Sequence, residues 1–584
     1  MTPVLRMAKR RLGASFFMLR PVGGIGALGC ALLATALLLP VGDAPWYSFW
    51  REWTAGAAVI FVLLSLLNIL RDRGLSLQWP LWSLQTAAIA LAAVVWVQYA
   101  AGLVPWRGDA WLSSVYLTGF ALCVLVAGSL PHAERASLAD FLAMALAVAG
   151  IVSAPLALLQ WTGHLTLDMG MPVAGGRPVA HMEQANLLCS LSIQGALGVW
   201  RLALRHRIRL RTAALPLVPM LMTVALTQSR VVWLVGPVLL AVVAWRRDLL
   251  PWRPHGQRLA GVIAVVFTAF LVLPWLNEQW ALAGAPLSER ASMGRRPAVW
   301  ALFIDAVWAQ PFWGWGALQN GAAQYQVATR HVSLGWYFSS AHNLILDLMV
   351  WFGAAIGLTA GAALLWATVG RLRGAVDAPR LVTALAAASL VLHALVELPL
   401  HYAYFLLPLG LMLGASRSDA TSGATLHLPA RLPGLIPALT LVPGLLLAAL
   451  ASDYIRLTDV RPGMVTDPST RNEIFEAQLP PPEVLLLDQL QGLHRLAVVP
   501  LRQAVGVAQL DAAKAAMLRS PMAPVIERQA LIAGLNGRTG DAQSALQRLC
   551  KFEPPAQCER SAHAWELWRA QWPQLPPWPS DAPP

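Results

Sequence analysis

Charged residues are scarce in this sequence. Only 12% of its 584 residues are Asp, Glu, Lys or Arg, and 57% are hydrophobic, whereas a soluble domain carries about 25% charged residues. Lysine is almost absent, since nearly all of the 43 basic residues are arginines. This composition excludes an ordinary soluble protein and indicates an all-α polytopic membrane protein, because a helix satisfies its own backbone polar groups in lipid.

Recognised motifs for nucleotides and metals are also missing. The sequence contains no Walker-type glycine loop, no Asp-x-Asp and no H-E-x-x-H, so we expect no cofactor and no metal. The net charge of +13 would suit nucleic acid, but the arginines lie in short loops between apolar runs. That distribution is typical of the cytoplasmic loops of a membrane protein and excludes nucleic acid as a partner.

Long apolar runs are abundant, and those of about 18–22 residues are long enough to cross a bilayer. The bias of arginines between loops places the N-terminus in the cytoplasm of a bacterial inner membrane. An odd number of spans then places the C-terminal region in the periplasm. We expect thirteen spans, at 22–41, 53–70, 80–100, 111–130, 138–160, 184–200, 213–227, 230–246, 259–276, 342–370, 381–399, 402–416 and 433–452.

Two polar regions interrupt this pattern. A transmembrane domain, 1–452, contains a large periplasmic loop at 277–341, in which the apolar residues between Trp300 and Trp308 have helical spacing. That helix either lies in the membrane interface or packs on the loop. Residues 453–572 form a helical domain with helices at 483–498, 501–518 and 523–551. Its last part is similar to a helix–turn–helix repeat of the tetratricopeptide kind, and the proline-rich end, 573–584, is expected to be disordered.

With this topology, polar residues from separate parts of the chain converge on the outer membrane face. On the inner face we expect only dispersed arginines that set the topology. The outer group comprises Arg177, His181, Glu183, Gln184, Asn186, Arg230, Arg290, Arg295, Arg296, His342, His393 and Glu397.

These residue types suit a particular chemistry. Arginines bind phosphate or pyrophosphate oxygens bidentately, and a neutral histidine accepts a hydroxyl proton near neutral pH. Structural alternatives remain open: Arg230 as a residue that reaches the interface, His342 as a helix-start residue, and His393 with Glu397 as a pair on one helix face that holds spans together.

Three blocks of sequence resemble the O-antigen ligase/polymerase superfamily. They are Thr227-Gln228-Ser229-Arg230, the segment from Arg296 to Gly316, and Ser340-Ala341-His342-Asn343. The block from His393 to Phe405 and the helical domain after the last span are similar to PglL/PilO-type protein O-linked oligosaccharyltransferases.

This resemblance implies a GT-C-like membrane fold that transfers an oligosaccharide from undecaprenyl pyrophosphate to Ser or Thr hydroxyls of periplasmic proteins such as pilin, without metal or nucleotide. It implies that His342 and Arg230 are catalytic and that Arg177, Arg230, Arg295 and Arg296 bind the donor pyrophosphate. Asn186, Asn343, His393 and Glu397 would support them. The alternatives are a ligase to lipid A core, a polysaccharide polymerase or, outside this class, a lipid-linked glycan transporter or an assembly protein.

Five cysteines are present, and two of them lie close together in the C-terminal domain. Cys550 and Cys558 are separated by a segment with two prolines, which favours a turn. In an oxidising periplasm such thiols tend to pair, so the sequence predicts a Cys550–Cys558 disulfide, with two free thiols as the alternative.

Overall fold

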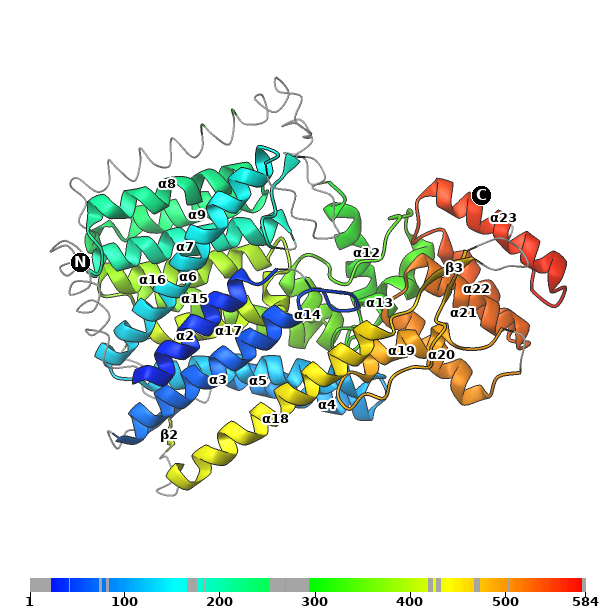
Figure 1. Cartoon of the computed structure of the whole chain (residues 1–584), viewed down its shortest axis with the longest axis horizontal. Coiled ribbons are helices and arrows are strands. Elements are labelled where there is room, and N and C mark those ends of the chain that lie inside the picture. The colour runs from blue at the N-terminus through cyan, green and yellow to red at the C-terminus, as the bar shows by residue number, and fades with distance from the viewer. Residues whose placement is uncertain are drawn as a thin grey trace, which may run out of the picture.

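The computed structural model describes residues 23–579 except 41, 73–75, 80–82, 165–175, 183, 251–293 (apart from 268 and 272), 419–423, 427–431, 467–472 and 502–503. Figure 1 shows a bundle of long helices at one end and a smaller lobe of short C-terminal helices at the other. Part of the expected periplasmic loop lies between them. The bundle contains α2 (Gly23–Leu38), α3 (Phe49–Asp72), α4 (Leu84–Ala100), α5 (Arg107–Ser129), α6 (His132–Trp161), α7 (Ala185–Leu204), α8 (Leu210–Leu226), α9 (Val231–Trp245), α15 (Ala354–Arg373), α16 (Ala378–Ala394), α17 (Ala403–Ala415) and α18 (Leu432–Asp459).

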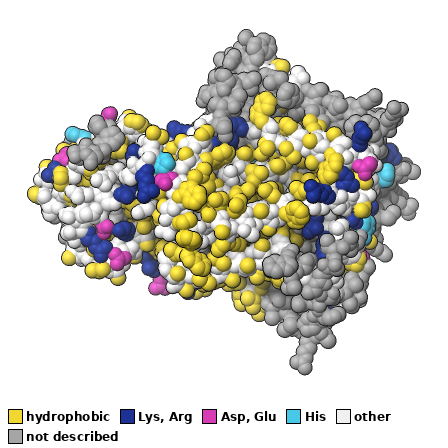
Figure 2. Space-filling model, turned by 180° about the vertical axis from the view of Figure 1, so that it is seen from behind, with side chains coloured by type: hydrophobic (Ala, Val, Ile, Leu, Met, Phe, Trp, Pro, Cys, Tyr) yellow, Lys and Arg dark blue, Asp and Glu magenta, His cyan; other side chains and the backbone are white. Residues whose placement is uncertain are grey.

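The bundle confirms an all-α polytopic membrane protein. Within the described residues, 6 helices are long and apolar enough to cross a membrane, and shorter apolar helices accompany them. Most coincide with the expected spans to within a few residues. The expected span at 259–276 falls almost entirely outside the described residues, so the total of thirteen stays a prediction. Figure 2 shows a broad hydrophobic face bordered by Lys and Arg on two sides, as expected for a helix bundle in lipid.

The expected single span at 342–370 is wrong, because the chain breaks at Gly353. Two helices, α14 (Leu344–Phe352) and α15, meet there. Gly353 has φ 87°, and a Cβ at this position would collide with the Phe312 carbonyl, so only glycine fits. The Trp315 N–H donates to the Val350 carbonyl (2.8 Å) and the Ala354 N–H to the Pro311 carbonyl (2.8 Å). Helix α14 is therefore tied to the loop, and α15 is the span.

The loop contains α12 (Arg296–Ala309) and α13 (Asn320–Val327), followed by the 3₁₀ turn η4 (Ala328–Arg330). The predicted apolar stripe of α12 divides between two environments. Phe303 and Val307 are buried against α13 and α14, whereas Ile304 and Trp308 are 48% and 70% exposed. One side of α12 therefore packs on the loop, and placement of its other side in the membrane interface stays a prediction.

The C-terminal lobe consists of helix hairpins around one hydrophobic core. The predicted helix 523–551 is two helices that turn at Asn536 and Gly537, as the helix–turn–helix pattern indicated; a tetratricopeptide array stays a prediction. The elements are α19 (Asp488–Ala497), α20 (Val507–Arg519), α21 (Ala523–Leu535), α22 (Thr539–Leu549) and α23 (Pro555–Gln571). The remaining small elements are the antiparallel pairs β1 (Leu77–Trp79) with β2 (Ala424–Leu426) and β3 (Gly463–Thr466) with β4 (Glu473–Glu476), and the 3₁₀ turns η3 (Arg247–Leu249) and η5 (Pro399–His401).

The first residues of the end expected to be disordered, 573–584, pack on the C-terminal lobe. Leu575 is 2% exposed in the lobe core, and the Trp565 indole donates to the Pro576 carbonyl (2.9 Å). Residues 573–578 therefore pack on the lobe, because Leu575 and Trp578 supply apolar side chains that a composition argument overlooks. Residues 580–584 lie outside the described part of the chain.

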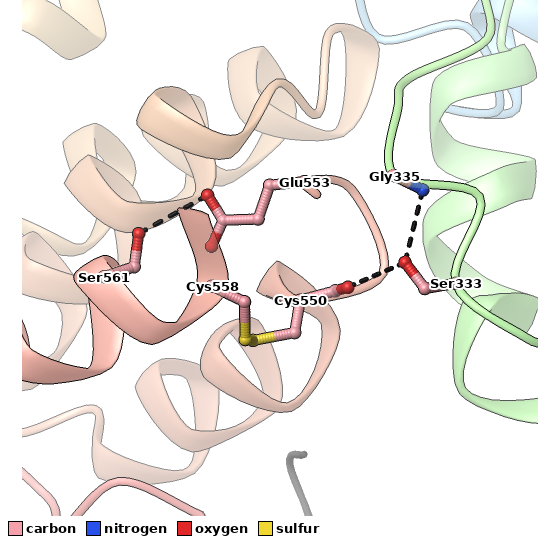
Figure 3. Close-up of a disulfide and its surroundings, with 6 residues drawn as sticks. All are labelled: Ser333, Gly335, Cys550, Glu553, Cys558 and Ser561. Atoms are coloured by element: carbon pink, nitrogen blue, oxygen red, sulfur yellow. Dashed lines mark hydrogen bonds between the residues drawn. A yellow bond between two sulfur atoms is a disulfide. The ribbon is translucent and has the colours of Figure 1, made fainter. Parts of the chain in front are cut away.

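Cys550 and Cys558 are joined by a disulfide bond, with a Cα–Cα distance of 5.1 Å. Figure 3 shows that the turn between them faces the loop: the Ser333 hydroxyl donates to the Cys550 carbonyl (2.9 Å) and accepts from the Gly335 N–H. Glu553 lies close enough to form a metal-ligand cluster with the two cysteines, but the disulfide uses both sulfur atoms.

A buried ion pair joins the C-terminal lobe to the bundle. The Arg519 guanidinium binds Asp109, at the start of α5, through two hydrogen bonds of 2.8 and 2.9 Å. Asp109 is 0% exposed. At the adjacent Gly108, the backbone N–H donates to the Asp488 carboxylate (2.6 Å). Breaking a buried pair leaves an uncompensated charge, so the lobe has a fixed position on the bundle.

Candidate functional site

Five helix ends meet where the bundle joins the loop. They are the starts of α7, α9, α12 and α14 and the end of α16. Each brings a polar residue that the sequence placed on one membrane face: Asn186, Arg230, Arg296, His342 and Glu397.

Glu397 lies at the centre of this group. Its Oε2 is 2.8 Å from the His342 Nδ1, while its Oε1 accepts from the Asn186 amide (2.8 Å) and from the Arg296 guanidinium. The Glu397 side chain is 7% exposed, and that of His342 is 28% exposed. A buried carboxylate therefore orients an imidazole that remains partly accessible.

A second layer of contacts fixes Asn186. Its Oδ1 accepts from the Arg177 guanidinium (2.9 Å) and the Ser229 hydroxyl (2.8 Å), and the Arg177 Nε donates to the Thr227 carbonyl (2.7 Å). Burial, together with the nearby cations Arg230 and Arg296, lowers the pKa of the Arg177 guanidinium from its ordinary value. The site is thus electropositive, since one carboxylate faces three arginines.

Arg230 reaches this position because of a tight turn between α8 and α9. Gln228 has φ 45° and is 4% exposed, which keeps the two helices separate although almost no polar sequence divides them. Arg230 is the N-cap residue of α9. Its guanidinium lies against Gly294, where a Cβ would be 2.8 Å from a guanidinium nitrogen. A glycine here leaves room for the planar group.

The backbone of His342 has φ 53°, a left-handed conformation that is uncommon outside glycine. Asp347, 1% exposed, holds it there. Its carboxylate accepts from the Ser340 hydroxyl (2.6 Å) and the Ala341 N–H (2.8 Å), and the Ser340 hydroxyl accepts from the His342 N–H (2.9 Å). His401 lies 3.2 Å from the same carboxylate.

Sequence reasoning missed Asp347, Ser340 and His401 as site residues. The available signal was a carboxylate in an otherwise apolar helix, three residues after Leu344. An acidic residue in the first turn of a helix is common for dipole reasons alone, which hid its role in shaping the histidine turn.

Three other expected site residues have different partners. Arg295 donates to the Leu334 carbonyl (3.0 Å), and Asn343 caps α14 by accepting from Ile345 and Leu346. His181 is buried with its Nε2 on the Leu37 carbonyl (2.8 Å). Glu183 and Arg290 lie outside the described residues.

The expected side-chain pair of His393 and Glu397 is wrong. Helix α16 ends at Ala394, and the two side chains bond different partners. His393 is fully buried and its Nδ1 contacts the Ser190 hydroxyl on α7. It holds α16 to α7 below the site, whereas Glu397 serves the site itself.

An apolar cavity of about 470 Å³ adjoins the site. Its wall includes Ser339 and Leu344, on either side of His342, and Leu398, next to Glu397. Much of the remaining lining comes from apolar residues of α4, α5, α14, α15 and α17. The cavity therefore lies beside the polar site and among helices of the bundle.

The fold and site define a polytopic helical membrane protein with an arginine–histidine–glutamate site at one end of its spans. Two protein families match the sequence: residues 215–360 match a family described as O-Antigen ligase, and 381–566 one described as Virulence factor membrane-bound polymerase, C-terminal. The chain is 28% identical over 445 residues to a General O-oligosaccharyltransferase of Acinetobacter baylyi, covering 73% of this chain and 75% of the relative. It is 33% identical over 127 residues to a ComP-specific O-oligosaccharyltransferase of the same organism, covering 22% and 23%. The chain is similar to the O-antigen ligase superfamily and to its PglL/PilO-type members.

Proposed function

We propose that this protein transfers an oligosaccharide from a polyprenyl-pyrophosphate carrier to serine or threonine hydroxyls of other proteins. The observation that carries this proposal is the contact between the His342 Nδ1 and the buried Glu397 carboxylate (2.8 Å). It assigns the imidazole one tautomer. With the proton on Nδ1, the Nε2 atom carries the lone pair that can accept a hydroxyl proton.

In the proposed step, the acceptor hydroxyl oxygen attacks the anomeric carbon of the glycan. The bond from that carbon to the pyrophosphate oxygen breaks, the polyprenyl pyrophosphate leaves with the electron pair, and the hydroxyl proton passes to the His342 Nε2. Charge develops on the leaving group, so preorganised cations stabilise the transition state more than the ground state.

Arg177, Arg230 and Arg296 are the groups that would stabilise this leaving group. Glu397 neutralises one positive charge, which leaves an excess of two in the site when His342 is neutral. Arg295 and Asn343 act indirectly in this proposal, through the Leu334 carbonyl and the start of α14. The apolar cavity beside the site offers room for the first isoprene units of the carrier.

Orientation and partners belong to the same proposal. The carrier is undecaprenyl pyrophosphate, the site and the C-terminal domain 453–572 face the periplasm, and the acceptors are pilin-like proteins. The arginine-rich ends of α7 and α15 support this orientation, since they lie at the opposite end of the bundle. The names of the two Acinetobacter relatives support a protein acceptor.

A polysaccharide polymerase is the second candidate, favoured by the family match over residues 381–566. Mass spectrometry of periplasmic proteins from strains with and without the chain separates the two. Glycan-modified serine or threonine peptides that require the chain support protein transfer, whereas unmodified proteins with a shortened surface polysaccharide would overturn it. His342→Ala should abolish modification at normal expression, while the exposed Glu483→Gln should leave it unchanged.

We further propose that transfer needs no metal. Incubation of the purified protein with EDTA should leave the transfer rate unaltered. Inhibition that is reversed by adding back a divalent ion would contradict this.

A further inference from the structure

A pocket of about 200 Å³ lies at the membrane end opposite the candidate site. It is formed where α6 and α16 begin and where α7 and α17 end. The charged and titratable side chains that line it are those of His132, Arg135, Arg201, Arg205, Asp377 and Arg380. The sequence suggested only dispersed arginines at this end, but the fold gathers four of them around one hollow.

Three of these arginines are buried. Arg135 and Arg201 are each 4% exposed, and Arg380 is 7% exposed. Arginines that only set topology are expected in solvent-facing loops, as Arg209 is. Burying a guanidinium costs free energy unless it is paired and hydrogen-bonded, so these positions call for a local explanation.

Carboxylates near the pocket are too few to balance the arginines. Asp140 is 0% exposed and pairs with Arg201 (2.9 Å), Arg205 (3.3 Å) and Arg207 (3.2 Å). Asp377 caps α16 by accepting the Arg380 N–H (2.7 Å). Glu134, 2% exposed, lies beside Arg135 at the start of α6, so three carboxylates stand among five arginines here.

Backbone carbonyls satisfy several of the N–H groups without supplying charge. Arg135 donates to the Arg417 carbonyl (2.7 Å), and Arg201 donates to the carbonyls of Ala136 (2.9 Å) and Pro379. Arg380 and Arg417 also act on Arg135 as like charges. These neutral carbonyl groups therefore fix the orientation of the guanidinium groups, and the pocket keeps an excess of positive charge.

We propose that this pocket binds the phosphodiester head of an anionic phospholipid. Guanidinium groups bind phosphate oxygens bidentately, and basic pockets between helices at the inner membrane surface suit anionic lipid heads. The position decides between lipid and soluble anion: the pocket sits at the ends of four apolar helices, where a lipid phosphate lies. The bound lipid would join α6, α7 and α16, and the last two carry Asn186 and His393 near the candidate site.

The test uses the full chain purified in neutral detergent. Phosphatidylglycerol should raise the melting temperature by several degrees more than phosphatidylcholine does. Arg380→Gln should weaken phosphatidylglycerol binding by about tenfold or more, the loss of one charge-assisted hydrogen bond. Arg373→Gln, an exposed arginine at the same end of the bundle that does not line the pocket, is the matched control and should bind as the wild type does.

Native mass spectrometry of the same samples counts retained lipids. Inorganic phosphate, added at the concentration of the lipid, should give no comparable shift; if it does, the site takes soluble anions and the lipid assignment is wrong. Equal retention of phosphatidylglycerol by wild type, Arg380→Gln and Arg373→Gln would also overturn the proposal. If Arg380→Gln does not fold, Arg205→Gln replaces it, since that side chain is 36% exposed.

Discussion

Replacing Glu397 by glutamine tests whether the Glu397 carboxylate sets the tautomer of His342. The substitution keeps the size of the side chain and removes its charge. Its remaining oxygen can still accept from Asn186 and Arg296, as the Oε1 does in the wild type. The new amide group then faces the Nδ1 of His342, where the carboxylate oxygen stood at 2.8 Å.

The amide is a donor, so it selects the wrong imidazole tautomer. The favoured hydrogen bond places the lone pair on Nδ1 and the proton on Nε2, which can no longer accept a hydroxyl proton. Returning to the active tautomer breaks that hydrogen bond and places the Nδ1 proton opposite the amide N–H group. This change costs about 2–4 kcal/mol. The transfer rate should fall by about 30- to 1,000-fold, because about 1.4 kcal/mol corresponds to a factor of ten.

The assay is transfer of a lipid-linked glycan to an acceptor in proteoliposomes, with kcat and the donor KM measured separately. The kcat should fall while the donor KM stays equal or decreases, since losing the carboxylate makes the site more positive. Glu483→Gln controls for the loss of one negative charge at an exposed position. Wild-type kcat in a folded Glu397→Gln protein would refute the assigned tautomer, and a lower melting temperature with unchanged kcat would show a purely structural role.

The remaining predictions concern single groups. Arg230→Lys should lower transfer substantially, because an ammonium cannot reproduce a planar bidentate contact with pyrophosphate; full activity in initial-rate assays would make Arg230 a point charge only. Cys550→Ser should lower the unfolding free energy of the C-terminal lobe by about 2–3 kcal/mol in the chain-entropy account, measured by denaturant melts, and thiol labelling without reductant would show that Cys550 and Cys558 are not paired. Burial and the nearby Glu553 raise the pKa of Glu527 to about 8. The folded lobe therefore binds more protons than the unfolded lobe, and its stability should decrease as the pH rises from about 4.5 to 8. Glu527→Gln should reduce this pH dependence in thermal melts. An unchanged slope of stability against pH would contradict the prediction.

Hydropathy was sufficient to place the described spans because each depends on local composition. It failed at Gly353, since the break there depends on hydrogen bonds to Pro311 and Trp315, some forty residues earlier in the chain. A glycine inside an apolar run does not reveal such partners. The end of α16 before Glu397 was missed for the same reason, because the polar groups that hold Glu397 come from α7, α12 and the His342 turn.

The site was predictable as a set of residues on one membrane face, but its contacts were not. Arg295 and Arg296 are neighbours in sequence and equally basic, yet only Arg296 bonds Glu397. Successive residues on a helix point about 100° apart, so the position of α12 against the bundle decides which one enters the site. That position follows from packing of Phe303 and Val307, which a sequence pattern does not orient.

The ion pair of Arg519 with Asp109 holds the C-terminal lobe at one distance from the helix bundle. A lobe on a flexible linker would occupy many positions, and it could present acceptors at many distances from the candidate site. This lobe cannot tilt without exposing the Asp109 carboxylate, which is completely buried. Under the proposed function, a membrane-anchored acceptor is therefore selected by the distance between its own anchor and its hydroxyl, as well as by the residues around that hydroxyl.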